Sequence, residues 1–295
     1  MGVNMKFYVI TIAAIFLALG IGIFIGFNID SQQFYMEQQN SLIDEMTKKF
    51  DEMKQQNIDL NKKNAEVQSD LELYQQYSEG VFPFFAKDRL NGINVAVIET
   101  TDDYIYSSLK NTLKSAGADV VNITAVHSKL EESVNDDALK NKITNNVSSE
   151  DMDKNNIPQL TSDVIAQHII NHKYGDLMKY LSDNEYIEMK GDYSLPVDYV
   201  IIAGGSVEND NFINAVDIPI IKAIKKEQIP IIGVERSDVK HSYMEDYKKE
   251  KISTVDNVDN VIGETSLIIV MQGVEGNYGV KKSSSSLMPA MNRGV

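Results

Sequence analysis

Acidic side chains near the ends of predicted strands are the residues of this sequence best suited to chemistry. Residues 252–264, ISTVDNVDNVIGE, place Asp256 and Asp259 three apart between an extended-looking and a helical-looking segment. Carboxylates there can bind a metal ion or a nucleotide, or they can cap the free N–H groups of a helix. Because residues 258–271 have apolar side chains at helical spacing, we favour capping of a helix that begins near Asp259.

The other candidate ligand-binding residues also follow predicted strands. They are Asp102, Asp103, Gly204, Gly205 and Ser206. Ligands of parallel α/β sheets bind at the carboxyl ends of the strands, which is where these residues belong. The glycine pair lacks the pattern of a dinucleotide fingerprint or a Walker loop, and there is no Gly-x-Ser-x-Gly elbow. We therefore expect no enzymatic activity, with an exported enzyme or small-ligand binder using these residues as an alternative.

Metal-ligand patterns in the sequence are sparse. His168 and His172 lie four apart on a predicted helix, a spacing that lets two imidazoles share zinc or copper, although a polar helix face also explains them. Asp151, Asp153 and Asn155 begin like a calcium loop, but the turn glycine and the final glutamate are missing. The chain contains no cysteine, which excludes disulfides and thiolate metal sites. We expect no bound cofactor.

The elements that position these residues begin with an apolar segment. Residues 7–28 contain the uncharged run 7–27, long enough to cross the roughly 30 Å hydrocarbon core of a membrane. The run is longer than the core of a signal peptide and lacks a cleavage site, so we expect a retained single-pass anchor. Lys6 precedes the run and acidic residues follow it, which favours a cytoplasmic tip of residues 1–6 with the bulk of the chain extracytoplasmic. Gly20, Gly22 and Gly26 offer a packing face for a second anchor helix.

Residues 31–78 have the seven-residue repeat of a coiled coil. The a positions are Met36, Ile43, Phe50, Asn57, Asn64 and Leu71, and the d positions are Gln39, Met46, Met53, Leu60, Val67 and Tyr74. Asparagine at a favours two parallel strands and fixes their register, so Asn57 and Asn64 predict a parallel homodimer. At about 1.5 Å per residue, this stalk would hold the following domain roughly 70 Å from the membrane.

Short apolar, β-branched runs then alternate with helical patterns across residues 79–275. Residues 82–92 form a hinge-like helix or turn, and strands are predicted at 93–99, 118–126, 197–205 and 229–234. Helices are predicted at about 103–115 and 211–227, and this alternation is typical of a parallel sheet covered on both faces. The fold class is therefore α/β: a transmembrane helix and a long parallel coiled coil, followed by a doubly wound, Rossmann- or flavodoxin-like domain.

Two segments are too polar to fit this pattern. We expect residues 129–159 to form a mobile surface insertion and residues 276–295, with their run of four serines, to form a flexible tail. The net charge of −15 argues against nucleic acid as a partner, because phosphate backbones attract clustered lysine and arginine.

Several stretches together resemble the MctB family, often labelled copper transporters, whose members include SteB-like envelope proteins. They are residues 12–26, the strand 93–99, the run STVDNVDNVIGE and the closing GNYGV. The resemblance implies an exported α/β domain on a single-pass anchor. For copper-labelled members it implies a role in copper transport or homeostasis, and for SteB-like members a SteA-like cytoplasmic partner in cell-wall or division control.

We therefore expect a non-enzymatic, membrane-anchored, dimeric coiled-coil scaffold of the cell envelope. Copper handling is the alternative, and its support in the residues is limited to His168 and His172. A single transmembrane helix cannot enclose a pore by itself, which favours the scaffold.

Overall fold

A computed structural model describes residues 5–146, 156–173, 175–208 and 211–290 of the chain. The start of the cytoplasmic tip, the calcium-like run Asp151, Asp153 and Asn155, and the last five residues lie outside this description. The chain divides into two compact units, Met1–Gln75 and Gln76–Val295, which are described separately.

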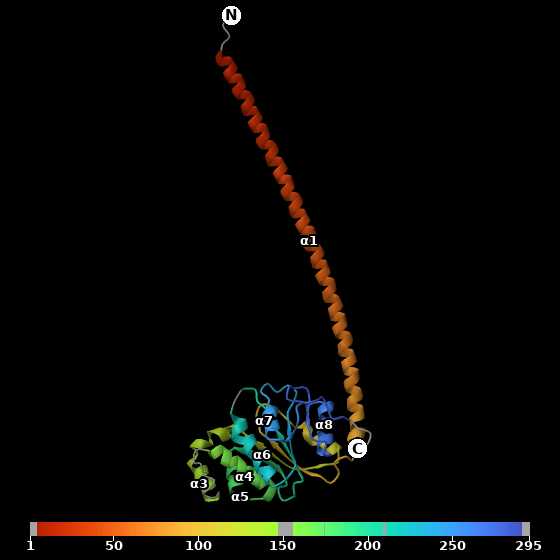
Figure 1. Cartoon of the computed structure of the whole chain (residues 1–295), viewed down its shortest axis with the longest axis vertical. Coiled ribbons are helices and arrows are strands. Elements are labelled where there is room, and N and C mark those ends of the chain that lie inside the picture. The colour runs from red at the N-terminus through yellow and green to blue at the C-terminus, as the bar shows by residue number, and fades with distance from the viewer. Residues whose placement is uncertain (1–4, 147–155, 174, 209–210, 291–295) are drawn as a thin grey trace. The chain divides into compact units, whose positions relative to one another are not determined.

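The N-terminal unit consists of helix. Helix α1 spans Met5–Ala86 and is continuous through the predicted anchor and stalk (Figure 1, red to orange). Its first part, Met5–Phe27, is the one helix within the described residues that is long and apolar enough to cross a membrane.

The hinge expected at residues 82–92 differs in the structure. Helix α1 continues through Gly80 and Pro83 to Ala86, and only residues 87–92 form turns. Phe82 and Ala86 are buried in the core of the second unit. Burial of this last turn offsets the helix-breaking cost of proline, about 3 kcal/mol.

The second unit is built on one seven-stranded sheet with the order β3-β2-β1-β4-β5-β6-β7. The strands are β1 (Asn94–Glu99), β2 (Asp119–Val126), β3 (Ile187–Gly191), β4 (Tyr199–Ala203), β5 (Ile231–Val234), β6 (Ser253–Val255) and β7 (Asn277–Tyr278). All neighbouring pairs are parallel except β2 with β3. The α/β fold class is thereby confirmed, with one antiparallel edge strand that the sequence analysis did not identify.

Alternate residues of the strands pack into two separate hydrophobic cores, one on each face of the sheet. Ala96 and Ile98 of β1 belong to one hydrophobic cluster, and Val95 and Val97 belong to the other. The first face is covered mainly by η1 (Ser128–Asn135), α3 (Asp137–Asn146), α4 (Ile157–Asn171), α5 (Gly175–Asp183), η2 (Ile213–Asp217), α6 (Ile218–Lys226) and α7 (Met244–Lys249). The second face is covered by α2 (Ser108–Ser115), α8 (Val261–Met271) and the last turn of α1.

Two predicted helices begin later or less regularly than expected. The helix predicted from residue 103 is α2 and begins at Ser108, because residues 103–107 cross the carboxyl edge of the sheet as a loop. The helix predicted at 211–227 begins as the π-helical η2 and becomes α6 at Ile218, beside Pro219 in its first turn.

The insertion and the tail also differ from expectation. Where the structure describes residues 129–159, they form η1, α3 and the start of α4, and they bury Leu130, Leu139, Ile143 and Ile157 in the first core. Four apolar residues thus fix a segment whose composition is otherwise polar. Residues 276–290 of the expected flexible tail include β7 and a following segment bound to the sheet edge.

Candidate functional site

The structure brings most of the predicted site residues to one edge of the sheet. Asp102 and Asp103 follow β1, Gly204, Gly205 and Ser206 follow β4, and Asp256 and Asp259 follow β6. Between β1 and β4 the direction of the strand order reverses, which is where doubly wound folds usually bind ligands.

The domain's own side chains fill this reversal point. The hydroxyl of buried Tyr106 donates a hydrogen bond to Gly204 O at 2.6 Å, and the hydroxyl of Tyr104 accepts one from Lys240 N at 3.1 Å. Asp103 Oδ2 accepts from Val207 N at 2.8 Å, which ties the loop after β1 to the loop after β4. The groups that a ligand would use between these strands are therefore already bonded.

The glycine pair has a packing explanation. A Cβ atom on Gly204 would overlap the hydroxyl of Tyr247, and one on Gly205 would lie 2.6 Å from Val239 Cγ1. Gly205 also has a φ of +100°, which side chains strongly disfavour. Ser206 Oγ donates to Glu208 O at 2.6 Å. Gly204, Gly205 and Ser206 therefore form a tight turn, which agrees with the lack of a phosphate-loop pattern in the sequence.

Asp256 binds the chain's own C-terminal segment. Its fully buried carboxylate accepts hydrogen bonds from Val280 N at 2.7 Å, Lys281 N at 3.0 Å and Ser284 Oγ at 2.5 Å. We call residues 280–284 the C-terminal strap. The strap closes the carboxyl edge beside β6, so Asp256 has a structural use that its local sequence does not reveal.

Asp259 is not the helix cap that the sequence analysis favoured. The cap of α8 is the next residue, Asn260, whose side-chain oxygen accepts from Ile262 N and Gly263 N, both at 3.1 Å. Asp259 instead accepts from the backbone and the hydroxyl of Ser237 at 2.6 and 2.7 Å, and so links the loops after β5 and β6. Helix capping therefore does explain this stretch, but the capping residue is Asn260, one residue after Asp259.

Two buried acids at this edge were missed by sequence reasoning. Glu235, directly after β5, is fully buried and pairs with Lys281 Nζ of the strap at 2.5 Å. Burial raises the pKa of Glu235, and the charge and hydrogen bond of Lys281 oppose that rise. The sequence around Glu235 gives no indication of this pairing, because Lys281 lies far along the chain.

The second missed acid is Asp217 in η2. Its Oδ1 accepts from Thr100 Oγ1 at 2.7 Å and from the hydroxyl of Tyr247, whereas Oδ2 has no partner among the described residues. Desolvation by complete burial raises the pKa of Asp217 to about 7, despite these hydrogen bonds. This carboxyl group is therefore partly protonated at neutral pH.

Asp102, one of the predicted acids of this edge, lines a cavity. Asp102 Oδ1 lies 2.6 Å from Nδ1 of His127, and Oδ2 accepts from the backbone and hydroxyl of Ser128 at 2.9 and 2.8 Å. Burial raises the pKa of Asp102, but the hydrogen bonds from His127 and Ser128 outweigh it and lower the pKa overall. The cavity, of about 590 Å³, is also lined by Lys129 and Met189.

The contact between Asp102 and His127 fixes the orientation of the imidazole ring. With its Nδ1–H donated to the carboxylate, His127 presents Nε2 as a base or a metal ligand, and no described residue hydrogen-bonds that nitrogen. His127 was not singled out in the sequence. The signal would have been its place at the end of the second predicted strand, next to the strand that precedes Asp102.

The predicted histidine pair does not form a helical i, i+4 ligand pair. Helix α4 ends at Asn171, and His172 has a left-handed backbone with φ of +56°. His168 Nδ1 lies 2.7 Å from Lys173 O, to which it donates. Desolvation lowers the pKa of His168 from its ordinary value, against the hydrogen bond to Lys173 O, which raises it. Within the described parts of the chain, no three His, Cys, Asp or Glu side chains gather around a common metal position.

The predicted packing residues of α1 lie on the helix with open surroundings. Cβ atoms added to Gly20, Gly22 and Gly26 would meet no atom within 4 Å. Asn57 and Asn64 are exposed, and Asn61 Nδ2 donates to Asn57 Oδ1 at 2.8 Å within the same helix.

Comparison with known proteins agrees with the resemblance. The family model described as "Copper transport outer membrane protein, MctB" matches residues 3–289, which includes both the apolar helix and the α/β domain. Comparison with curated proteins finds no match. Because the family match runs through the apolar start of α1, the rest of that helix and the α/β domain, this chain belongs to the MctB family.

Proposed function

We propose that this protein is a non-enzymatic, membrane-anchored scaffold that dimerises through helix α1. The observation that carries the proposal is the row of large apolar side chains at the a and d positions of α1, all of them exposed within the chain. They are Met36, Ile43, Met46, Phe50, Met53, Leu60, Val67, Leu71 and Tyr74.

A second copy of the same helix can cover this row. Full burial of one such side chain contributes about 1.5–3 kcal/mol, whereas the same side chains on an isolated helix stay in water. The seven-residue spacing matches a left-handed two-stranded coil, and asparagines 57 and 64 at a favour the parallel pair. Two chains anchored in one membrane by Met5–Phe27 already share this orientation.

The scaffold would have its short N-terminal tip in the cytoplasm and its α/β domain outside the cell membrane, following the positive charge before the apolar helix. The dimer would then connect the two sides of the membrane. A SteA-like cytoplasmic protein and a role in cell-wall or division control are the partner and process that the SteB-like resemblance supports.

Cysteine cross-linking of the full-length protein tests the dimer, because the chain has no cysteine of its own. Met53→Cys places a thiol at a d position, and Gln55→Cys places one at the outward f position of the same heptad. In detergent micelles under mild oxidation, we expect a disulfide-linked dimer for M53C and little for Q55C. Equal cross-linking of both variants, or a monomeric mass by light scattering, would refute the parallel coiled coil.

Copper binding is the second candidate function. It is supported by the family description and by the cavity whose lining includes both carboxylate-held His127 and Met189, two residue types that can bind copper. Titration of the full chain with Cu(I) and Cu(II) distinguishes the candidates. Stoichiometric binding that is lost in His127→Gln but kept in a His168→Gln, His172→Gln variant would favour copper, and no binding tighter than roughly micromolar would exclude it.

A further inference from the structure

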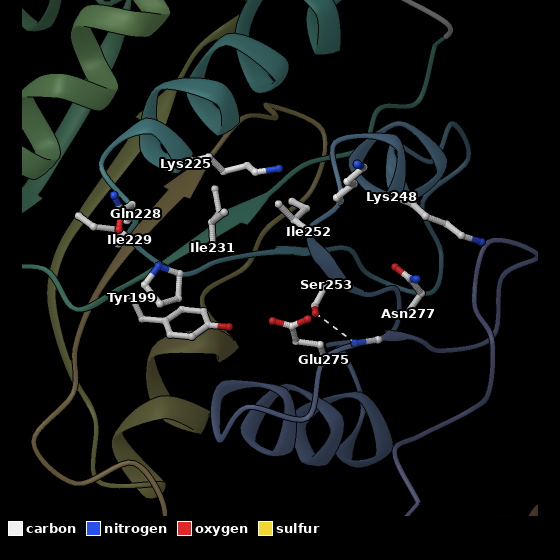
Figure 2. Close-up of a pocket in the computed structure, with 13 residues that line it drawn as sticks. Tyr199, Lys225, Gln228, Ile229, Ile231, Lys248, Ile252, Ser253, Glu275 and Asn277 are labelled. Atoms are coloured by element: carbon white, nitrogen blue, oxygen red, sulfur yellow. Dashed lines mark hydrogen bonds between the residues drawn. The ribbon is translucent and has the colours of Figure 1, made fainter.

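A second cavity lies at the opposite, amino edge of the sheet. It has a volume of about 570 Å³ and is bordered by the first residues of β4, β5, β6 and β7 (Figure 2). This volume is in the range of small-molecule sites, about 300–1,000 Å³. None of the candidate ligand-binding or metal-binding residues named in the sequence analysis lines it.

Three lysines surround this cavity, in a protein whose net charge is −15. Lys225 comes from α6, Lys248 from α7 and Lys251 from the turn after α7. Within the described residues, none of the three forms a salt bridge with a carboxylate. Lysines beside them on the same helices do: Lys222 pairs with Glu250 at 3.6 Å, and Lys249 pairs with Asp246 at 2.7 Å.

Carbonyl groups position two of these ammonium groups without neutralising them. Lys225 Nζ donates to Glu250 O, and Lys248 Nζ donates to Ser283 O at 3.1 Å. Each ammonium has three N–H donors, so donors remain for a ligand. These two positive charges are therefore held in place, and neither forms an ion pair with a carboxylate of the described residues.

The other walls add donors and an apolar surface. Asn277 Oδ1 accepts from Thr254 Oγ1 at 2.9 Å, which orients the amide so that its NH₂ group is the remaining partner for a ligand. Burial, and then the charge of Glu275, raises the pKa of Tyr199 to about 12, so its phenol stays protonated. The Tyr199 hydroxyl and the Glu275 carboxylate point toward one another (Figure 2). Ile229 and Ile252 supply apolar wall.

The backbone of the cavity wall is strained at two positions. Gln228 and Lys251, which follow α6 and α7, have φ values of +60° and +58°. Glycine is the usual residue at such helix-ending positions, because other residues adopt this conformation at a cost. Such residues are enriched at ligand-binding sites, and two of the five non-glycine residues with positive φ within the described residues border this cavity.

The charge balance favours an anion. The ends of α6 and α7 each contribute about half a negative charge, and Glu275 contributes one. Three ammonium groups exceed that total. Lysines in the last turn of a helix also offset its dipole, but that role does not require Lys251, which lies beyond its helix.

We propose that this cavity binds a small organic anion: a phosphate or carboxylate group beside Lys225 and Lys251, with an apolar or aromatic body against Tyr199 and the isoleucines. Lys248 contributes its charge from the rim, where its ammonium is held by Ser283 O (Figure 2). The proposal is independent of dimerisation and of copper.

Saturation-transfer NMR and calorimetry on the full chain in detergent would test it with phenyl phosphate, benzoate and inorganic phosphate. The groove variant replaces Lys225, Lys248 and Lys251 with glutamine. The control variant removes the same charge from the same helices, as Lys222→Gln, Lys226→Gln and Lys249→Gln. We expect saturable binding of phenyl phosphate or benzoate, weakened at least tenfold in the groove variant and less than threefold in the control.

Tighter binding of phenyl phosphate than of benzoate would identify phosphate as the preferred group, and weaker binding of inorganic phosphate would show that the apolar wall contributes. Equal losses in both variants would indicate general attraction to positive charge and overturn the proposal, as would the lack of saturable binding of any probe. Circular dichroism checks the fold of each variant. If the triple groove variant fails to fold, Lys251→Gln alone should still weaken binding more than Lys249→Gln.

Discussion

Asp256→Asn tests whether one buried carboxylate holds the C-terminal strap. In the native protein, Oδ1 accepts from Val280 N, and Oδ2 accepts from Lys281 N and Ser284 Oγ. An amide has the same shape but only one oxygen, so an NH₂ group must replace one acceptor. The hydroxyl of Ser284 can reverse its role and accept, whereas a backbone N–H cannot.

The magnitude follows from this count. Whichever way the amide points, one backbone donor of the strap loses its acceptor, which costs about 1–3 kcal/mol. The remaining bonds lose the assistance of the negative charge, so we expect the free energy of unfolding to fall by about 2–4 kcal/mol. Chemical denaturation measures this change. Trypsin should also cleave faster at Lys281 and Lys282, because the strap is released more often.

Asp259→Asn is the matched control, since this acid lies in the same loop but is exposed and does not contact the strap. It should leave cleavage in the strap unchanged. Asp256→Asn with native stability and native cleavage would refute the reasoning, because three short hydrogen bonds to a buried carboxylate would then contribute nothing measurable.

Substitutions at three further positions test polar groups that hold the domain together. Lys281→Met leaves Glu235 buried without its cation and should reduce the free energy of unfolding by about 3–5 kcal/mol at pH 8. Because burial raises the pKa of Glu235, the loss should become smaller as the pH falls and the carboxylate is protonated; a loss that is the same at every pH of a denaturation series would contradict this. Asp217 has a pKa of about 7 in the folded domain and an ordinary one near 3.8 when unfolded, so the folded state binds the extra proton and stability falls as pH rises between these values, by up to about 1.4 kcal/mol per pH unit. Asp217→Asn keeps the acceptor for Thr100 and Tyr247 and should flatten that slope in denaturation series from pH 4 to 8; an unchanged slope would assign it to another group. Asn260→Ala should cost about 1 kcal/mol through loss of the α8 cap, and Asn260→Asp should restore it.

The sheet could be predicted because buried parallel strands are short, apolar and rich in β-branched residues. The run IPIIGV is an example, and β5 forms within it at Ile231–Val234. The antiparallel strand β3, IEMKG, was missed because an edge strand is apolar on one face only and carries charges on the other. The polar insertion was misjudged because four apolar residues are enough to fix its helical turns once a sheet face is available to bury them.

The uses of the site residues could not be predicted from local sequence. Asp256 and Lys281 are separated by 25 residues, Glu235 and Lys281 by 46, and Thr100 and Asp217 by 117. A carboxylate after a strand is placed to accept hydrogen bonds from N–H groups at the carboxyl edge. Whether those groups belong to a ligand or to a neighbouring loop depends on contacts that only the folded chain creates.

The two edges of the sheet therefore differ in what they leave available. At the carboxyl edge, Asp103, Asp256 and Asp259 are all bonded to the domain's own loops and strap, and Tyr106 occupies the reversal point. At the amino edge, Lys225, Lys248 and Lys251 keep charges that no described carboxylate pairs with. Binding energy comes from groups whose bonding capacity is still unmet, since satisfied groups must first give up the partners they have. An anion of the kind proposed above thus finds more free cationic donors at the amino edge, where doubly wound folds do not usually place their site, whereas the Nε2 of His127 at the carboxyl edge suits a metal ion instead.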